Sequence, residues 1–499
     1  MISKVFNVCE YDNNRECAAR ERNGTERPTR MHREARERAR RASMATSARG
    51  RSGKVVGGTI ALACVACVMW VVSGLGRTTT TMMMAGTGVA TYAKGSHGRR
   101  TAMDSSSWST SSTSLSSSNG GGMEMKANVG GRVSSEESLF DDARRKFTFK
   151  TRGRGHALVT GGAGYIGSHC ALKLLELGYA VTVIDNLSRG NSGAVRAVRH
   201  FAPEGMFRAV FGDLGRVEDI EAAMGNSNEE VDVVFHFAAI AYVGESMADP
   251  LKYYRNVTTN TVNLLDVMAA RGVTNLVYSS TCATYGNAKE LPITEKTPTV
   301  PINPYGKSKL YAENAIRDYA KANPDFKATI LRYFNVFGSD PEMRVGELPR
   351  AELRAHGRIS GACFDAAMKN IDKLTVMGTK HPTRDGTTIR DFVHVVDLVD
   401  AHIAIAQKQK LANPPSLYNV GTGKGVSMLE FVEACKKVTA KDIEIEYREE
   451  PRPGDYAEVY ANVDKIRNEL GWEAKYTNLE ESLSHAWKFR SNIVDNRWD

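Results

Sequence analysis

Short apolar runs alternate with longer amphipathic stretches through the middle of the chain. The runs are rich in Val, Ile, Leu and aromatic residues and end at glycine or polar residues, which is typical of buried strands. The predicted strands are residues 157–160, 179–185, 207–212, 231–237, 275–280 and 328–333. The intervening stretches 168–177, 217–224, 251–270 and 307–321 carry apolar side chains at helical spacing. This alternation predicts an α/β fold, a doubly wound parallel sheet of the Rossmann type with helices on both faces.

The pattern changes after residue 337. Glycine, proline and charged residues dominate to about residue 391. The tail from residue 414 mixes predicted strands (417–420 and 443–447) with predicted helices (428–438 and 479–490). We interpret residues 338–491 as a smaller, mainly substrate-binding portion that closes over the carboxyl ends of the strands in residues 153–337.

A charge-free apolar segment runs from Val55 to Leu75. It is long enough to span a bilayer as a helix, and a core helix, the alternative, would find nothing to pack against in the polar sequence around it. Basic residues are concentrated before the segment, so the positive-inside rule predicts a type II membrane protein with residues 1–54 as a disordered cytosolic tail. Residues 76–152 are largely rich in Ser, Thr and Gly and are interpreted as a flexible stem. An organellar transit peptide competes with this interpretation, but seven acidic residues in the first 37 argue against it.

The formal net charge of +9 is not spread evenly. Residues 1–54 contain fourteen Lys or Arg and seven Asp or Glu, so the rest of the chain is close to neutral and a nucleic-acid partner is not indicated. The eight cysteines are scattered. Cys64 and Cys67 lie inside the apolar segment without a second Cys or His pair, so neither a metal site nor a disulfide framework is predicted.

A glycine turn separates the first predicted strand from the first predicted helix. Gly161, Gly164 and Gly167 would place backbone N–H groups and a helix N-terminus around an anion, and a Cβ there would keep the backbone away from a pyrophosphate. Asp185 ends the next strand, eighteen residues after Gly167, where a carboxylate accepts both hydroxyls of an adenosine ribose. Because this carboxylate would repel a 2′-phosphate, we predict NAD rather than NADP as the cofactor.

Three further positions follow predicted strands. Asp213, before Leu214, is placed to accept the adenine amino group, with a simple turn aspartate as the alternative. Phe237-Ala238-Ala239 ends the fourth strand, and its small residues would let a cofactor backbone pass. Asn256 lies on the following helix and is a further candidate for a cofactor contact, with a surface asparagine as the alternative.

Tyr305 and Lys309 lie four residues apart and share one face of a predicted helix. A tyrosine with its ordinary pKa near 10 is a poor base at neutral pH, but a neighbouring ammonium and a positive nicotinamide ring would lower that pKa. Thr281, after the fifth strand, would bring a hydroxyl to the same substrate oxygen. An exposed helical pair is the alternative, yet with the glycine turn upstream the three residues predict proton transfer coupled to hydride transfer.

The chain resembles the extended short-chain dehydrogenase/reductase family, and within it the nucleotide-sugar 4-epimerases, over about residues 153–490. The matching stretches are 161–167, 185–188, 236–239, 243–246, 250–254, 305–309, 331–335, 390–394 and 452–455. The resemblance implies a tightly held NAD that is regenerated in every turnover, and a homodimer. It also implies a further set of cofactor contacts from Tyr165, Ile166, Asn186 and Tyr333, and of UDP contacts from Asn335, Arg390, Arg452 and Asp455.

In such an enzyme Tyr305 removes the proton of the sugar 4-OH, the C4 hydride passes to NAD, and the 4-keto sugar turns over before the hydride returns. Thr281 hydrogen-bonds the 4-oxygen, and Lys309 holds the nicotinamide ribose. Related dehydratases and decarboxylases usually carry an acid one or two places after the hydroxyl residue, whereas Thr281 is followed by Cys282 and Ala283. We therefore expect epimerisation rather than elimination.

Two stretches, 280–286 and 357–364, resemble plant UDP-arabinose 4-epimerases, which interconvert UDP-xylose and UDP-arabinose and carry a Golgi membrane anchor. Specificity for UDP-glucose, or for both sugars, is the alternative, because Val459 at the expected sugar wall is small. A non-catalytic NAD-binding regulator is a remote alternative. Together with the predicted type II orientation, this resemblance implies a lumenal catalytic domain on the Golgi membrane, with a cytosolic or organellar soluble domain as the alternative. The sequons at Asn186 and Asn256 fall where NAD is expected.

Overall fold

The computed structural model describes residues 153–225, 230–408 and 411–493. The predicted cytosolic tail, membrane segment and stem (1–54, 55–75 and 76–152) lie outside these residues. Within the described part of the chain, no helix has the length and apolar character of a membrane span.

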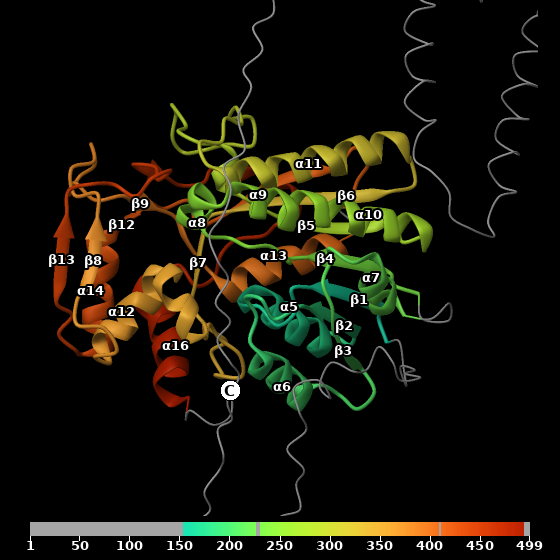
Figure 1. The fold of residues 1–499 in the computed structure, drawn as a ribbon, viewed down its shortest axis with the longest axis horizontal. Coiled ribbons are helices and arrows are strands. Elements are labelled where there is room, and N and C mark those ends of the chain that lie inside the picture. Colours follow the sequence, from blue (N-terminus) through green and yellow to red (C-terminus); the bar gives the residue numbers. More distant parts are fainter. Residues whose placement is uncertain (1–152, 226–229, 409–410, 494–499) are drawn as a thin grey trace, which may run out of the picture. The chain divides into compact units, whose positions relative to one another are not determined.

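Within the described residues the main sheet has seven strands, all parallel, in the order β3-β2-β1-β4-β5-β6-β11 (Figure 1). These strands are β1 (His156–Thr160), β2 (Ala180–Asp185), β3 (Phe207–Phe211), β4 (Val233–His236), β5 (Asn275–Thr281), β6 (Lys327–Tyr333) and β11 (Ser416–Val420). The doubly wound parallel sheet is confirmed. Its strands read as continuous apolar runs because helices cover both faces.

Two separate clusters of buried apolar side chains fill the two faces of this sheet. One lies under α5 (Tyr165–Glu176), α6 (Ser192–Phe201) and α13 (Val395–Gln407). The other lies under α7 (Val217–Met224), α10 (Asn260–Ala270) and α11 (Pro304–Ala322). Strand order reverses at β1, which lies between β2 and β4, and the crevice outside the carboxyl ends of such strands is where ligands bind in this architecture.

Strand β11 differs from the prediction, which assigned residues 417–420 to the smaller portion. It pairs in parallel with β6 along its full length and forms the edge of the main sheet. Helix α13, also beyond residue 337, packs against α5. Both faces of the sheet are buried, so a short apolar run far along the chain is stabilised more by joining it than by forming a separate small sheet.

The predicted helix over residues 251–270 is interrupted. It forms as α9 (Pro250–Tyr253), a π-helical segment (Tyr254–Thr259) and α10, and follows α8 (Val243–Ala248). π-Helical turns are rare and often occur at functional sites. Here the turn carries Asn256, whose side-chain oxygen accepts a hydrogen bond from the Ile240 backbone N–H at 2.8 Å. The turn thus braces the loop that follows β4.

The smaller portion has its own apolar core, packed between α12, α14 and α16 (Figure 1). Its helices are α12 (Ile359–Ala367), α14 (Met428–Thr439) and α16 (Leu479–Asn492), whereas α15 (Asp464–Leu470) packs on β11 and adds to the core of the main sheet. Its strands are β8 (Leu374–Met377), β9 (Ile389–Arg390), β10 (Phe392–His394), β12 (Val426–Ser427), β13 (Ile445–Arg448) and β14 (Glu458–Val459), and β10 pairs with β7 (Asn335–Phe337), which lies just before residue 338. Several of these elements lie in the stretch where the sequence showed no regular pattern. They are too short to be stable alone and depend on tertiary packing.

Candidate active site

The glycine turn packs closely against the neighbouring backbone and leaves no room for side chains. Gly161 has φ +71°, a conformation that side chains other than glycine rarely adopt. A Cβ on Gly167 would lie 2.1 Å from the carbonyl oxygen of Gly161, so the first turn of α5 can approach β1 only with glycine there. The turn therefore places the N-terminus of α5 beside the carboxyl end of β1, in the geometry that binds anions.

Asp185 is buried at the end of β2. Its Oδ2 accepts the Ala163 backbone N–H at 3.0 Å and its Oδ1 accepts that of Leu187 at 2.8 Å. Burial raises the pKa of this carboxyl to about 6, against the opposing effect of these hydrogen bonds. Beside it, Asn186 Nδ2 donates to Asp213 Oδ2 at 2.7 Å. The two carboxylates form an acceptor-rich end of the crevice, suited to ribose and adenine donors.

All the predicted site residues line one cavity of about 1170 Å³. The cofactor set at its walls is Gly161, Gly164, Tyr165, Ile166, Gly167, Asp185, Asn186, Asp213, Leu214, Phe237, Ala238, Ala239, Asn256, Tyr305, Lys309 and Tyr333. The predicted substrate set is Thr281, Tyr305, Asn335, Arg390, Arg452 and Asp455. The cavity thus extends from the glycine turn and the buried Asp185 to residues of the smaller portion. These residues fit NAD.

Helix α11 positions the predicted catalytic pair. Asn303 caps the helix by accepting the Gly306 N–H, and Tyr305 and Lys309 follow on one buried face. Lys309 Nζ donates to the Ser279 carbonyl at 2.7 Å, and burial lowers the pKa of this ammonium to about 7. Strand β5 ends at Thr281, which brings its hydroxyl to Tyr305.

The protein's own residues act against ionisation of Tyr305. Burial raises the pKa of the tyrosine, with Tyr333 adding to the increase and the Thr281 hydrogen bond and the charge of Arg358 opposing it. The lowering expected from Lys309 together with a positive nicotinamide ring stays a prediction. Two physical reasons account for this. The phenolate loses solvation in the buried site, and Lys309 donates to a backbone carbonyl and is itself only partly charged near neutral pH.

A buried ion pair beneath β5 was missed by the sequence argument. Glu313, on α11, is fully buried and accepts two bonds from Arg332, from Nε at 2.9 Å and from Nη2 at 2.5 Å. The Ser280 hydroxyl also donates to Glu313, at 2.5 Å. This network ties α11 to β5 and β6 directly behind Thr281. Residues 19 and 33 positions apart make it, so no local pattern reveals it.

The predicted UDP residues lie on the wall supplied by the smaller portion. Arg390 is buried, and its Nη2 donates to Asp455 and, at 2.6 Å, to the carbonyl of Tyr456. Its Nη1 donates to the carbonyl of Ile389 at 2.8 Å. Two of the predicted UDP residues are therefore bound to each other in the structure. Asn335 and Arg452 line the same wall.

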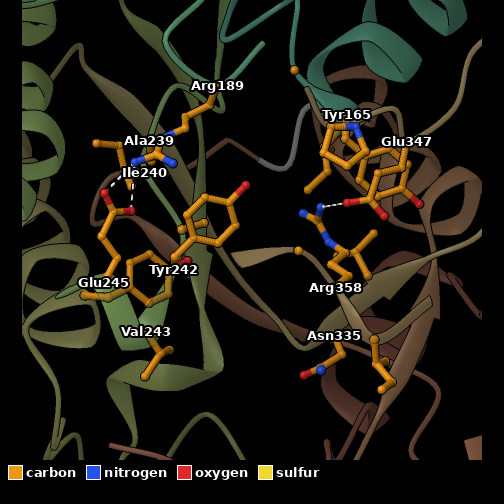
Figure 2. Close-up of a pocket in the computed structure, with 18 of the residues that line it drawn as sticks. Tyr165, Arg189, Ala239, Ile240, Tyr242, Val243, Glu245, Asn335, Glu347 and Arg358 are labelled. Atoms are coloured by element: carbon orange, nitrogen blue, oxygen red, sulfur yellow. Dashed lines mark hydrogen bonds and ion pairs between the residues drawn. The ribbon is translucent and has the colours of Figure 1, made fainter. Parts of the chain in front are cut away.

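Two further ion pairs line the cavity, and the sequence analysis did not predict their pairing. Arg189 Nη2, after β2, donates to both oxygens of Glu245 on α8, at 2.6 and 2.8 Å, and its guanidinium lies 5.0 Å from the ring centre of Tyr242. Arg358, before α12, bonds to Glu347. Figure 2 shows the two pairs on opposite sides of the cavity.

Comparison with known proteins places the chain in a family. The sequence profile of the NAD dependent epimerase/dehydratase family matches residues 157–421. The chain belongs to this family. The match covers the glycine turn, the Tyr305–Lys309 helix and all seven strands of the main sheet except the first residue of β1. An NAD-dependent family agrees with the cofactor predicted from Asp185.

The relatives are sugar-nucleotide epimerases. UDP-arabinose 4-epimerase 1 of Arabidopsis thaliana is 57% identical over 336 residues, which are 67% of this chain and 79% of the relative. UDP-glucose 4-epimerase of Bacillus subtilis (strain 168) is 39% identical over 68% of this chain and 97% of its own length. Among solved structures, UDP-glucose 4-epimerase from Bifidobacterium longum in complex with NAD+ and UDP matches with a TM-score of 0.63 and 35% identity, over 68% of this chain and 98% of that one.

Proposed function

We propose that this chain is an NAD-dependent 4-epimerase of UDP-sugars, with UDP-xylose and UDP-L-arabinose as its main substrate pair. The observation that carries the proposal is the meeting of Tyr305, Lys309 and Thr281 in one cavity with the glycine turn of the sheet. The relatives named UDP-arabinose 4-epimerase, at 53 to 57% identity, support the choice of the pentose.

The chain's own residues supply the proton chemistry. Tyr305 takes the proton of the sugar 4-OH and later returns it, while Thr281 hydrogen-bonds the same oxygen. Lys309 would hold the nicotinamide ribose. The chemistry that NAD supplies when bound is reversible acceptance of the C4 hydride. Asn335, Arg390, Arg452 and Asp455 would hold the UDP, since a guanidinium fork meets phosphate oxygens bidentately.

A UDP-hexose is a second candidate for the substrate. Val459 is buried, lines the cavity and is small, so the wall leaves room for a hexose. UDP-glucose 4-epimerase activity, alone or with the pentose activity, is therefore the alternative. A non-catalytic NAD-binding regulator is the remote alternative, and the intact Tyr305, Lys309 and Thr281 speak against it.

The test is turnover by the purified full-length chain without added NAD. Incubation with UDP-xylose and, separately, with UDP-glucose is expected to form UDP-arabinose much faster than UDP-galactose. Tyr305→Phe is expected to lower kcat by about 10² to 10⁴ with an unchanged melting temperature, since it removes only the proton carrier. UDP-galactose as the sole product would establish the hexose alternative. If neither product forms even with added NAD, and Tyr305→Phe changes nothing, the non-catalytic NAD-binding regulator becomes the best account.

Membrane anchorage and Golgi location are part of the proposal. The segment 55–75 supports the anchorage by its length and lack of charge, and the Golgi location rests on the resemblance to plant UDP-arabinose 4-epimerases. Protection of the catalytic domain from added protease in sealed microsomes is the expected result, and a soluble, unprotected domain would support the cytosolic or organellar alternative. Asn186 and Asn256 both line the cavity and make side-chain hydrogen bonds, so an active lumenal enzyme is expected to show no mass shift from these sequons after glycosidase treatment.

A homodimer is likewise proposed. Large apolar side chains are exposed on neighbouring helices of one face, Met247 on α8, Leu251 on α9, Val262 on α10 and Tyr311 on α11. Such a face is suited to burial against a second copy. Sedimentation equilibrium is expected to give a dimer that Leu251→Asp with Tyr311→Asp converts to a monomer. A monomeric parent chain would overturn this part.

A further inference from the structure

Arg358 lies where the cofactor and substrate ends of the cavity meet. It directly precedes α12, and its guanidinium carbon lies 4.8 Å from the ring centre of Tyr165. Tyr165 is the first residue of α5, beside the glycine turn. In the other direction, the charge of Arg358 acts on Tyr305 and Tyr333 at the catalytic end. Figure 2 shows Arg358 between Tyr165, of the predicted cofactor set, and Asn335, of the predicted substrate set.

The guanidinium of Arg358 is held in place by one residue and keeps further N–H donors available. Nη1 donates to Glu347, and the guanidinium makes no other hydrogen bond to the described residues. About a third of the side chain, 34%, is exposed, and the residue lines the cavity. Arg390 offers a contrast, because both of its Nη atoms already donate to carbonyls or to Asp455. Arg358 therefore keeps N–H donors for a ligand in the cavity.

Its two neighbours fix the direction of these donors. Glu347 holds one edge of the fork, and the face of the guanidinium rests on Tyr165, whose hydroxyl donates to the Gly338 carbonyl at 2.6 Å. An arginine restrained in this way loses less side-chain entropy when it binds an anion. A planar fork with free parallel N–H groups matches the oxygens of a phosphate.

We propose that Arg358 is a diphosphate-binding residue at the junction of the cofactor and substrate sites. The proposal rests on the proposed function, which brings two diphosphates into this cavity, the pyrophosphate of NAD and the diphosphate of the UDP-sugar. Both present the same chemistry to Arg358, and the binding measurements below separate them.

The test compares ligands with and without phosphate in the full-length protein. With NAD-loaded protein, Arg358→Gln is expected to weaken UDP binding about tenfold, as for a charge-assisted hydrogen bond, while uridine binding stays unchanged. If the partner is instead the cofactor, the same variant weakens NAD binding to cofactor-stripped protein and leaves adenosine binding unchanged. Either pattern supports the proposal and names the diphosphate.

Three results would contradict it. One is unchanged affinity for both UDP and NAD. Another is a loss of affinity that is as large for uridine as for UDP, and as large for adenosine as for NAD, which would indicate a structural role. The third is an Arg358→Lys variant that binds more weakly than Arg358→Gln, because lysine keeps the positive charge. Arg384→Gln, which breaks the exposed Arg384–Glu430 pair outside the cavity, is the matched control and is expected to change neither affinity. A parent chain that fails to bind UDP would refute the proposed function itself.

Discussion

Two buried carboxylates, Glu313 beneath β5 and Asp185 at the end of β2, differ in the donors and cations that surround them. Glu313 is fully buried and surrounded by donors, with Arg332 bidentate and the Ser280 hydroxyl on the same carboxylate. A second cation, Arg317, approaches it at 3.9 Å. The protein itself therefore satisfies this charge.

Asp185 is also buried, and its side chain accepts backbone N–H groups, those of Ala163 and Leu187 among them. The charge of Arg350 acts on it, but no ion pair of Asp185 within 4 Å is recorded among the described residues. Burial consequently raises its pKa to about 6. Its remaining acceptor capacity lies at the cavity. The comparison indicates that charges satisfied within the protein hold the scaffold together, whereas charges left partly unsatisfied at the cavity serve the ligand.

The largest expected effect tests the scaffold charge. Glu313→Gln leaves Arg332 buried without its carboxylate and is expected to cost about 3 to 5 kcal/mol in the free energy of unfolding. Chemical denaturation measures this directly. Glu433→Gln, which removes the exposed Glu433–Lys436 pair, is the control and should cost less than about 1 kcal/mol. Equal losses of unfolding free energy in the two variants would show that Glu313 is not a scaffold charge.

The second prediction concerns Asp185 and pH. The ribose hydroxyls of NAD are the predicted partners of Asp185 and would bind its ionised form. With a pKa of about 6, the affinity for NAD should then be full above about pH 7 and about tenfold weaker at pH 5. Asp185→Asn should bind NAD weakly with no such pH dependence. Titration of cofactor-stripped protein with NAD at several pH values measures both, and an unchanged profile in the variant would assign the titration to another group.

The same raised pKa has a consequence for folding with the opposite sign. A carboxyl whose pKa is higher in the folded state favours folding when protonated. This contribution is present below about pH 4 and is lost as the pH rises through about 6. Asp185→Asn should therefore stabilise or leave unchanged the protein at pH 7.5, in contrast to Glu313→Gln. A loss as large as that of Glu313→Gln would show that Asp185 is a scaffold charge after all.

The smallest expected effect concerns the Arg189–Glu245 pair, which joins the loop after β2 to α8 across the crevice. Arg189→Gln is expected to speed NAD release about fivefold, because the partly buried pair contributes about 1 kcal/mol to closing the crevice. Cofactor retention on gel filtration and the release rate measure this. Lys252→Gln removes the more exposed cation on Glu245 and should have little effect. Equal release rates for both variants would refute the role in closing the crevice.

Local sequence was sufficient for much of the fold and of the site. Each predicted strand of residues 153–337 overlaps an observed strand, and helix α7 begins and ends where predicted. The glycine turn, Asp185 and the Tyr305–Lys309 spacing are contiguous signals, and all line the cavity. Sequence alone did not predict α6, α13 or the short elements between residues 335 and 394. It also did not predict that β11 pairs with β6, or the π-helical turn inside the predicted helix over 251–270.

The side chains that the sequence did not reveal are charged residues joined over long separations. Arg189 and Glu245 are 56 positions apart, so no local pattern reveals their pairing and only the fold brings them together. Arg390 and Asp455 were predicted as UDP contacts, but their hydrogen bond to each other across 65 positions was not. The rise that burial causes in the pKa of Tyr305 was also not foreseen, because desolvation depends on what surrounds the phenol.

The sequence by itself determined the parallel sheet, the dinucleotide turn and the identities of the reactive side chains, because strand burial, glycine conformation and helical spacing are local properties. The tertiary structure alone decided which charges are satisfied by the protein and which face the cavity. That distinction separates Glu313 from Asp185 and Arg390 from Arg358, since solvation and hydrogen bonding are set by neighbours that lie far away along the chain.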